Sequence, residues 1–204
     1  MAPAPRVEAV TVGASLPPPL LRTFADRGCM PRQPKLPSTP TGYNVPVEGS
    51  LFEEAEFFRA IADSGARALL IGRRALIALG IPVLTADYDF WLHIDDIAAF
   101  NRAVEPMGLC PTHTPEEARA RGRYVAENDE RVDVLVARSV PTADGVRVAF
   151  EDVWPRRRGL AVAPGVVLPV PATPDLILTK RFGGRPKDLE DIRLLEALGR
   201  EDGP

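Results

Sequence analysis

Two aspartates separated by one residue form the pattern in this chain most suited to chemistry. Asp87 and Asp89 lie in the segment TADYDFWLH, whose second half has the apolar and aromatic composition of a β-strand. Alternate side chains of a strand point to one face, so both carboxylates would emerge on the same surface. Such a pair suits Mg²⁺, which binds one or two carboxylates together with substrate phosphates and relieves their mutual repulsion. Asp-x-Asp also occurs in solvated turns and at sheet edges, so the surrounding elements must decide between the two interpretations.

The elements around the pair are predicted to place it beside a glycine turn. Residues 68–71 form a short buried strand, Gly72 turns the chain, and residues 73–79 favour a helix. The aspartate strand follows at 87–93, and an amphipathic helix with Asp95 and Asp96 as its caps covers 95–104.

The rest of the chain is predicted to complete a mixed sheet with flanking helices. Residues 123–126 and 132–137 read as a hairpin, which places Asp133 near the start of its second strand. Capping boxes open helices at Ser50-x-x-Glu53 and Thr114-x-x-Glu117, and residues 173–182 and 186–198 form a C-terminal helical pair. We therefore predict an α/β (α+β) fold.

Composition divides the chain into a tail and one domain. The chain has 204 residues, and ten of its 22 prolines lie in residues 1–49, where we expect an extended or disordered tail. The remaining core-forming segment, residues 50–200, is long enough for one globular domain.

Charge and hydropathy exclude two function classes. A formal charge of −3 argues against nucleic-acid binding by bulk electrostatics and leaves only a local basic patch for that purpose. The proline-broken start has no apolar run long enough for a signal peptide or a membrane span, so we expect a cytoplasmic protein without a membrane role. Cys29 and Cys110 lack partner histidines at metal-ligand spacing, and we expect neither a disulfide framework nor a zinc site.

The order of these motifs resembles the nucleotidyltransferase superfamily of the polymerase-beta type. In that family a Gly-Gly or Gly-Ser turn leads into a helix, an Asp-x-Asp strand follows, and a third aspartate lies on a neighbouring strand. The resemblance covers residues 50–198 and is greatest to the small bacterial minimal nucleotidyltransferases and abortive-infection toxin-like enzymes. Shared features are Ala75-Leu76 after the turn, Thr85 before the aspartates, Lys180, Gly184-Arg185-Pro186 and the helix start Lys187-Asp188-Leu189-Glu190-Asp191.

The resemblance implies a role for each candidate residue. Asp87, Asp89 and Asp133 would be catalytic and would hold Mg²⁺, with Asp133 close to the acceptor hydroxyl. Nucleotide phosphates would be bound at the Gly72 turn and by Arg73, Lys180 and Lys187. The reaction would move a nucleoside monophosphate from an NTP to a hydroxyl of RNA (such as tRNA), a protein or a small molecule, with a cognate antitoxin as a partner in a toxin-type system.

Arg73 departs from the family pattern, which has a second glycine or a serine at this position. Its planar guanidinium could bind phosphate directly, or its bulk could obstruct the approach of phosphate to the backbone. The alternative to an enzyme is therefore a degenerate nucleotidyltransferase-like module that binds a nucleotide or a protein without turnover. Asp133 has an alternative too, since it could be paired with Arg131 or Arg123.

Overall fold

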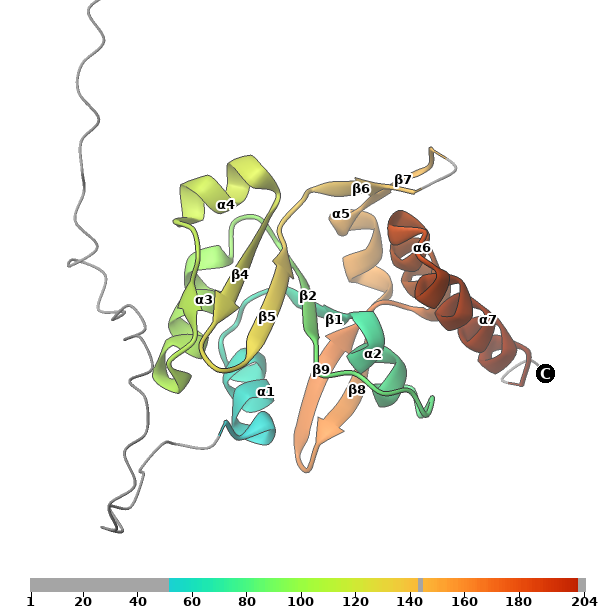
Figure 1. Cartoon of the computed structure of the whole chain (residues 1–204), viewed down its shortest axis with the longest axis horizontal. Coiled ribbons are helices and arrows are strands. Elements are labelled where there is room, and N and C mark those ends of the chain that lie inside the picture. Colours follow the sequence, from blue (N-terminus) through green and yellow to red (C-terminus); the bar gives the residue numbers. More distant parts are fainter. Residues whose placement is uncertain (1–51, 143–144, 202–204) are drawn as a thin grey trace, which may run out of the picture. The chain divides into compact units, whose positions relative to one another are not determined.

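The structure is a computed structural model, and it describes residues 52–142 and 145–201. Its centre is a mixed five-stranded sheet in the order β1-β2-β5-β4-β3 (Figure 1). β2 and β5 are parallel, and the other neighbouring strands are antiparallel. The predicted mixed sheet with flanking helices is confirmed. The strands are β1 (Ala68–Ile71), β2 (Tyr88–Leu92), β3 (Cys110–Pro111), β4 (Arg123–Glu127) and β5 (Arg131–Leu135).

One face of the sheet is the main hydrophobic core. Tyr88 and Phe90 lie two residues apart on β2, so their side chains share one face of the sheet, where both are buried. They pack against the first helices, α1 (Glu54–Asp63) and α3 (Ile97–Val104), where the ring centroids of Phe57 and Phe90 lie 6.0 Å apart and those of Phe90 and Phe100 lie 5.6 Å apart. This face is therefore closed by apolar side chains.

The opposite face is covered only in part. Trp91 is fully buried there in edge-to-face contact with Phe150 of α5 (Phe150–Val153), and its indole Nε1 donates a hydrogen bond of 2.8 Å to the Ala137 carbonyl. The hairpin of β6 (Ser139–Pro141) and β7 (Arg147–Ala149) adds Val140 and Val148 to the same small cluster. Asp89, two residues before Trp91, lies on this face beyond the covering cluster.

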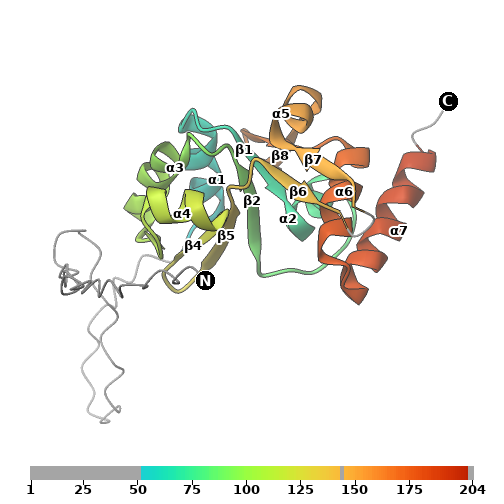
Figure 2. The ribbon, with the colours of Figure 1, turned by 90° about the horizontal axis from the view of Figure 1, so that it is seen from above.

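The remaining helices border the uncovered part of the sheet. α2 (Gly72–Ala78) follows β1 directly, and α4 (Pro115–Arg121) leads into β4. The predicted C-terminal pair is present as α6 (Thr173–Gly183) and α7 (Pro186–Glu201), which lie side by side in both ribbon views (Figure 2). Two 3₁₀ turns, Glu105–Met107 and Trp154–Arg156, and the hairpin β8 (Arg158–Ala163) and β9 (Val166–Val170) complete the described elements.

One of the two predicted capping boxes is present among the described residues. The box at Thr114 and Glu117 is present, with 3.2 Å from the Glu117 N–H to the Thr114 hydroxyl. α1 begins at Glu54 without a side-chain cap, and Ser50 of the other predicted box lies outside the described residues. Asp96 is also not a side-chain cap, because its carboxylate accepts a 2.7 Å hydrogen bond from the Arg67 guanidinium.

Two further expectations concern the chain as a whole. None of the helices in the part of the chain that the structure describes is both long and apolar enough to cross a membrane. Cys110 is disulfide-bonded, which contradicts the expectation that the cysteines would form no disulfide. Pairing depends on the distance between cysteines in space, and their spacing along the chain does not reveal it. Cys29 and the predicted proline-rich tail lie outside the described residues.

Candidate active site

The residues singled out from the sequence line a single cleft of about 800 Å³. Its floor is the uncovered face of the sheet, where Asp89 of β2 and Asp133 of β5 are direct partners in the strand register. Asp87 lies just before β2 and is exposed. The cleft thus brings together all seven predicted site residues: Gly72, Arg73, Asp87, Asp89, Asp133, Lys180 and Lys187.

Gly72 makes room for a carboxylate. Its backbone has a φ of +65°, in the left-handed region that L side chains rarely adopt. A Cβ at this position would lie 2.0 Å from Oδ2 of Asp89, far inside van der Waals contact. β1 and β2 are paired in register at Ile71 and Asp89, which places the turn against this side chain. Glycine is therefore required here both by the backbone conformation and by the position of Asp89.

The carboxylates of the cleft repel one another. Burial raises the pKa of Asp89 above its ordinary value, and the nearby charges of Asp133 and Asp87 raise it further. Lys180 and Lys187 act in the opposite direction but do not cancel the increase. Carboxylates that oppose one another's ionisation are stabilised in the charged form when a hard divalent cation binds between them.

Asp133 is held by an arginine of its own strand. Arg131 donates to both oxygens of its carboxylate, at 3.1 and 2.9 Å, which is one of the two pairings that the sequence left open. Within residues 52–142 and 145–201, no group of three or more His, Cys, Asp and Glu side chains is arranged to hold a metal. The three aspartates share a cleft without forming an assembled metal centre.

The ion pair between Arg131 and Asp133 is weak enough for another cation to replace Arg131. The side chains are 58% and 44% exposed, and pairs with such exposure contribute only about 0–1 kcal/mol. A cation that also binds Asp89 could therefore take over the Asp133 carboxylate at little cost. The donor set fits Mg²⁺ in its chemistry, with Asp133 available once it leaves Arg131.

We expect Arg131→Ala to bind Mg²⁺ more tightly than the wild type. The variant removes a competing partner of Asp133, and the loss of a pair worth up to about 1 kcal/mol corresponds to a gain of up to about fivefold in affinity. Titration of Mg²⁺ into the nucleotide-free proteins measures this change, with Arg102→Ala on α3 as the control for loss of an exposed arginine. Weaker Mg²⁺ binding in Arg131→Ala would contradict the proposed competition.

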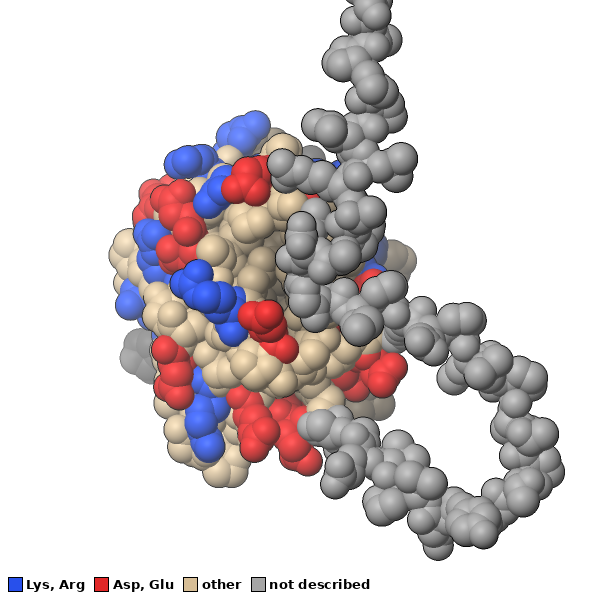
Figure 3. Space-filling view, turned by 90° about the vertical axis from the view of Figure 1, so that its left-hand side faces the viewer, with Lys and Arg blue, Asp and Glu red and all other residues tan. Residues whose placement is uncertain are grey.

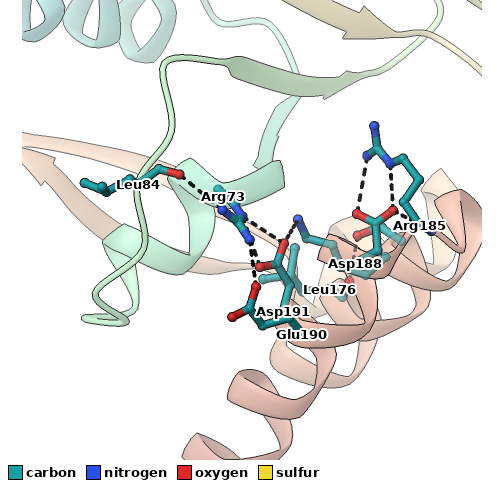
Figure 4. A network of polar contacts seen from close by, with 9 residues as sticks. Arg73, Leu84, Leu176, Arg185, Asp188, Glu190 and Asp191 are labelled. Atoms are coloured by element: carbon teal, nitrogen blue, oxygen red, sulfur yellow. Dashed lines mark hydrogen bonds and ion pairs between the residues drawn. The ribbon is translucent and has the colours of Figure 1, made fainter.

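A buried ion-pair network forms the wall of the cleft at α2, α6 and α7 (Figure 4). The Lys180 ammonium lies 2.8 Å from Oδ2 of Asp191, and Nε of Arg73 lies 3.1 Å from Oδ1 of the same carboxylate. Arg73 also donates to the Leu84 carbonyl at 3.3 Å and to Glu190 at 3.4 Å. The Arg73 guanidinium is thus directed toward α7, where it ties the turn after β1 to the C-terminal helices.

A second pair orders the start of α7. Arg185 donates to the nearly buried carboxylate of Asp188 at 2.8 Å. Burial works against ionisation of this carboxylate, but the hydrogen bonds from Arg185 hold the pKa of Asp188 below its ordinary value. Lys187 is exposed on the same turn. The start of α7 therefore presents one exposed lysine beside a fixed ion pair.

We expect Asp191→Ala to lower the free energy of unfolding by about 3–5 kcal/mol, because it leaves the buried Lys180 ammonium without its carboxylate. The side chains of Lys180 and Asp191 are only 9% and 1% exposed. Glu190→Ala is the matched control on the same helix, since the Glu190 side chain is 69% exposed and its removal should cost no more than about 1 kcal/mol. Urea unfolding measures both, and equal small losses would contradict the assigned burial.

Solved structures resemble this domain in fold. The solution structure of the antibiotic-resistance factor ANT(2'')-Ia has a TM-score of 0.51 and 17% identity, and the match covers 72% of this chain and 83% of that one. The lincosamide antibiotic adenylyltransferase LnuA, in its lincomycin-bound crystal structure, has a TM-score of 0.51 and 13% identity, with coverage of 72% and 98%.

The domain has a nucleotidyltransferase fold. No family model matches the sequence, and no curated protein matches it. The sequence resemblance to the nucleotidyltransferase superfamily is therefore confirmed at the level of the fold, while its toxin-like branch stays a prediction.

The cleft also contains residues that the sequence did not predict for the site. Arg121 and Arg123 line it from the junction of α4 and β4, together with Thr112 and His113 from the preceding segment. Phe182 of α6 lines it with a half-exposed ring. The sequence offered Arg123 only as a partner of Asp133, and no local pattern placed Arg121 or Phe182 near the cleft.

Two residues of the aspartate strand belong to the packed part of the sheet instead. Trp91 and His93 are buried. Nε2 of His93 lies 2.7 Å from Oε1 of Glu151, and its ring contacts Phe150 edge-to-face. Neither residue lines the cleft, so neither restricts access to the aspartates.

Proposed function

We propose that this domain is a magnesium-dependent nucleotidyltransferase that moves a nucleoside monophosphate from an NTP to an acceptor hydroxyl. The observation that carries the proposal is the convergence of Asp87, Asp89 and Asp133 on one open cleft beside the Gly72 turn. The fold supports this reaction class, since the solved structures with the same fold include an adenylyltransferase.

The carboxylates match the charge that develops in such a reaction. In an in-line displacement at the α-phosphorus, negative charge grows on the attacking and leaving oxygens. Magnesium supplies compensating positive charge when bound, and Asp87 and Asp89 are the residues that would hold it against the triphosphate. Asp133 lies beside Asp89 on the neighbouring strand, where it could accept the proton of the acceptor hydroxyl.

The basic residues of the α6–α7 wall suit the triphosphate. Lys187 is exposed at the start of α7, and Lys180 lines the same wall while paired with Asp191. Their charges act on Asp89 from the cleft, as the direction of their effect on its pKa indicates. We therefore assign Lys187 to the phosphates directly, and Lys180 and Arg73 to the positioning of the wall that carries it.

Calorimetric titration of ATP, GTP, CTP and UTP with Mg²⁺ tests the proposal. The wild type should bind at least one NTP in a metal-dependent way, and the Asp87→Ala/Asp89→Ala variant should lose that binding. Absence of binding to every NTP by a folded wild-type protein would overturn the nucleotidyltransferase assignment.

A second candidate is a nucleotide-binding module without turnover. The observation in its favour is the engagement of Asp133 by Arg131, which leaves the three carboxylates unassembled among the described residues. Single-turnover assays with α-labelled NTP separate the two candidates: release of pyrophosphate with label transfer or hydrolysis indicates an enzyme, whereas binding alone indicates the module.

A further inference from the structure

The cleft has a basic wall opposite the C-terminal helices. Arg121 is the last residue of α4 and Arg123 the first residue of β4, and both side chains are exposed along the cleft. Within the part of the chain that the structure describes, neither arginine is paired with a carboxylate. We refer to Arg121 and Arg123 as the β4 arginines.

Most other cations of the cleft have their charge satisfied. Arg73 and Lys180 share Asp191, Arg185 is paired with Asp188, and Arg131 is paired with Asp133. The β4 arginines therefore supply positive charge that the protein itself does not neutralise. In total the cleft is lined by seven Lys or Arg and five Asp residues, whereas the whole chain has a formal charge of −3.

Positive charge does not dominate every face of the molecule. Figure 3 shows the face that forms the left-hand side of Figure 1, where Lys and Arg alternate with Asp and Glu over the visible atoms and no single-sign field forms. An anion would therefore be attracted to the cleft by local charge and not by the domain as a whole.

Sheet order places the β4 arginines on the acceptor side of the carboxylates. Asp89 lies on β2 next to the Gly72 turn, and Asp133 follows on β5. Val125 of β4 is the register partner of Asp133, and Arg123 points to the same face because it lies two residues away on the strand. Along the cleft floor the order is thus Gly72, Asp89, Asp133 and then Arg123.

An in-line displacement needs its acceptor and leaving group on opposite sides of the phosphorus. With the triphosphate at the Gly72 turn and Lys187, the acceptor approaches from the side of Asp133 and the β4 arginines. A cationic acceptor would meet unpaired arginines there, at a cost in affinity. An acceptor phosphate would instead find two planar guanidinium groups, whose donor geometry matches phosphate oxygens.

We propose that the acceptor is a phosphate-bearing molecule whose phosphate is bound by Arg121 and Arg123. This inference rests on the proposed nucleotidyl transfer and narrows its acceptor. The phosphate can belong to an RNA strand or to a small phosphorylated metabolite, which share the same recognition chemistry. Polycationic acceptors such as aminoglycosides are disfavoured.

Matched acceptor probes test the proposal. Ribose 5-phosphate and ribose carry comparable hydroxyl groups and differ in the phosphate, and an octaribonucleotide tests the nucleic-acid source. Each is titrated into the wild type, Arg121→Ala/Arg123→Ala and the control Arg102→Ala. The titrations are run with and without a saturating α,β-methylene NTP and Mg²⁺, so that binding at the donor site is recognised.

We expect the wild type to bind ribose 5-phosphate or the octaribonucleotide at least about tenfold more tightly than ribose, because both guanidinium groups can form charge-assisted hydrogen bonds with the phosphate. Arg121→Ala/Arg123→Ala should lose this preference and still bind the NTP analogue, whereas Arg102→Ala should behave as the wild type. Binding of the octaribonucleotide alone identifies RNA as the source, and binding of ribose 5-phosphate alone identifies a small metabolite.

Three results would overturn the acceptor proposal. They are equal binding of ribose and both phosphate probes, unchanged phosphate binding in Arg121→Ala/Arg123→Ala, and loss of NTP-analogue binding in that variant with acceptor binding intact. Failure of the proposed function gives a different result. The wild type would then bind no NTP analogue, whereas the preference of the β4 arginines for phosphate is still measured in the titrations without the analogue.

Discussion

Asp89→Asn is expected to lower the rate of nucleotidyl transfer by about a thousandfold while making the nucleotide-free protein more stable at neutral pH. The loss of activity follows from removal of a charge that would hold the metal, a contribution of several kcal/mol to the transition state. The gain in stability follows from the electrostatics of the cleft, where burial and the charges of Asp133 and Asp87 oppose ionisation of Asp89.

The pH dependence fixes the sign of the stability change. The folded-state pKa of Asp89 lies above its ordinary value of 3.8, so between these two pKa values the folded protein holds more protons than the unfolded chain. The contribution of Asp89 to the free energy of unfolding therefore falls as the pH rises through that window. Asparagine does not ionise, so the variant should be the more stable protein above the window, and the difference should shrink toward acid pH.

Thermal unfolding of the metal-free proteins as a function of pH measures this difference. Asp63→Asn is the control, because Asp63 is an exposed residue of α1 outside the cleft. Addition of Mg²⁺ should stabilise the wild type and the control but not Asp89→Asn, since a ligand that binds only the folded state raises its stability. A variant that keeps its activity, or that is less stable than the wild type at neutral pH, would contradict the assigned role.

The carboxylate floor of the cleft was predictable because it depends on short-range geometry. Alternation along one strand is enough to place Asp87 and Asp89 on a common surface, and the hairpin pattern places Asp133 near the start of a strand. That Asp133 lies on a strand next to Asp89 was implied only by the family resemblance, and the parallel pairing of β2 with β5 that aligns the two residues is a finding of the structure. The local sequence pattern was therefore enough to identify these residues, whereas their alignment depends on the topology of the sheet.

The walls of the cleft were less predictable because their contacts join distant segments. Arg73 was considered as a phosphate ligand or an obstruction, but its guanidinium is engaged by carboxylates of α7, more than a hundred residues later in the chain. The pairing of Lys180 with Asp191 likewise depends on how α6 and α7 pack. Side chains with three or more rotatable bonds take their direction from such neighbours, which propensity and periodicity do not encode.

Gly72→Ala is expected to impair the cleft by displacing the Asp89 carboxylate. The added Cβ would lie 2.0 Å from Oδ2 and 2.7 Å from Cγ of Asp89, so the carboxylate must move or the turn must open. Misplacement of a metal-holding group by about 1 Å costs about a hundredfold in rate. The left-handed backbone and the overpacking should together lower the free energy of unfolding by about 2–5 kcal/mol.

Gly80→Ala separates these two causes. Gly80 has a φ of +86°, so alanine there meets the same kind of backbone strain, but nothing lies within 4 Å of the added Cβ. We expect Gly80→Ala to lose stability with little change in activity once folded, whereas Gly72→Ala should lose both. Similar activities for the two folded variants would mean that the contact with Asp89 does not matter for the reaction.

A double-mutant cycle then isolates the contact between Gly72 and Asp89. Asp89→Ala removes the two nearest atoms and leaves only its Cβ, 2.9 Å from the modified position, so Gly72→Ala should cost less stability in the Asp89→Ala background. Urea unfolding of the four proteins gives the coupling free energy. Additive losses would show that the glycine serves the backbone turn alone, whereas a smaller loss in the double variant would show that the turn after β1 is shaped by the carboxylate it must accommodate.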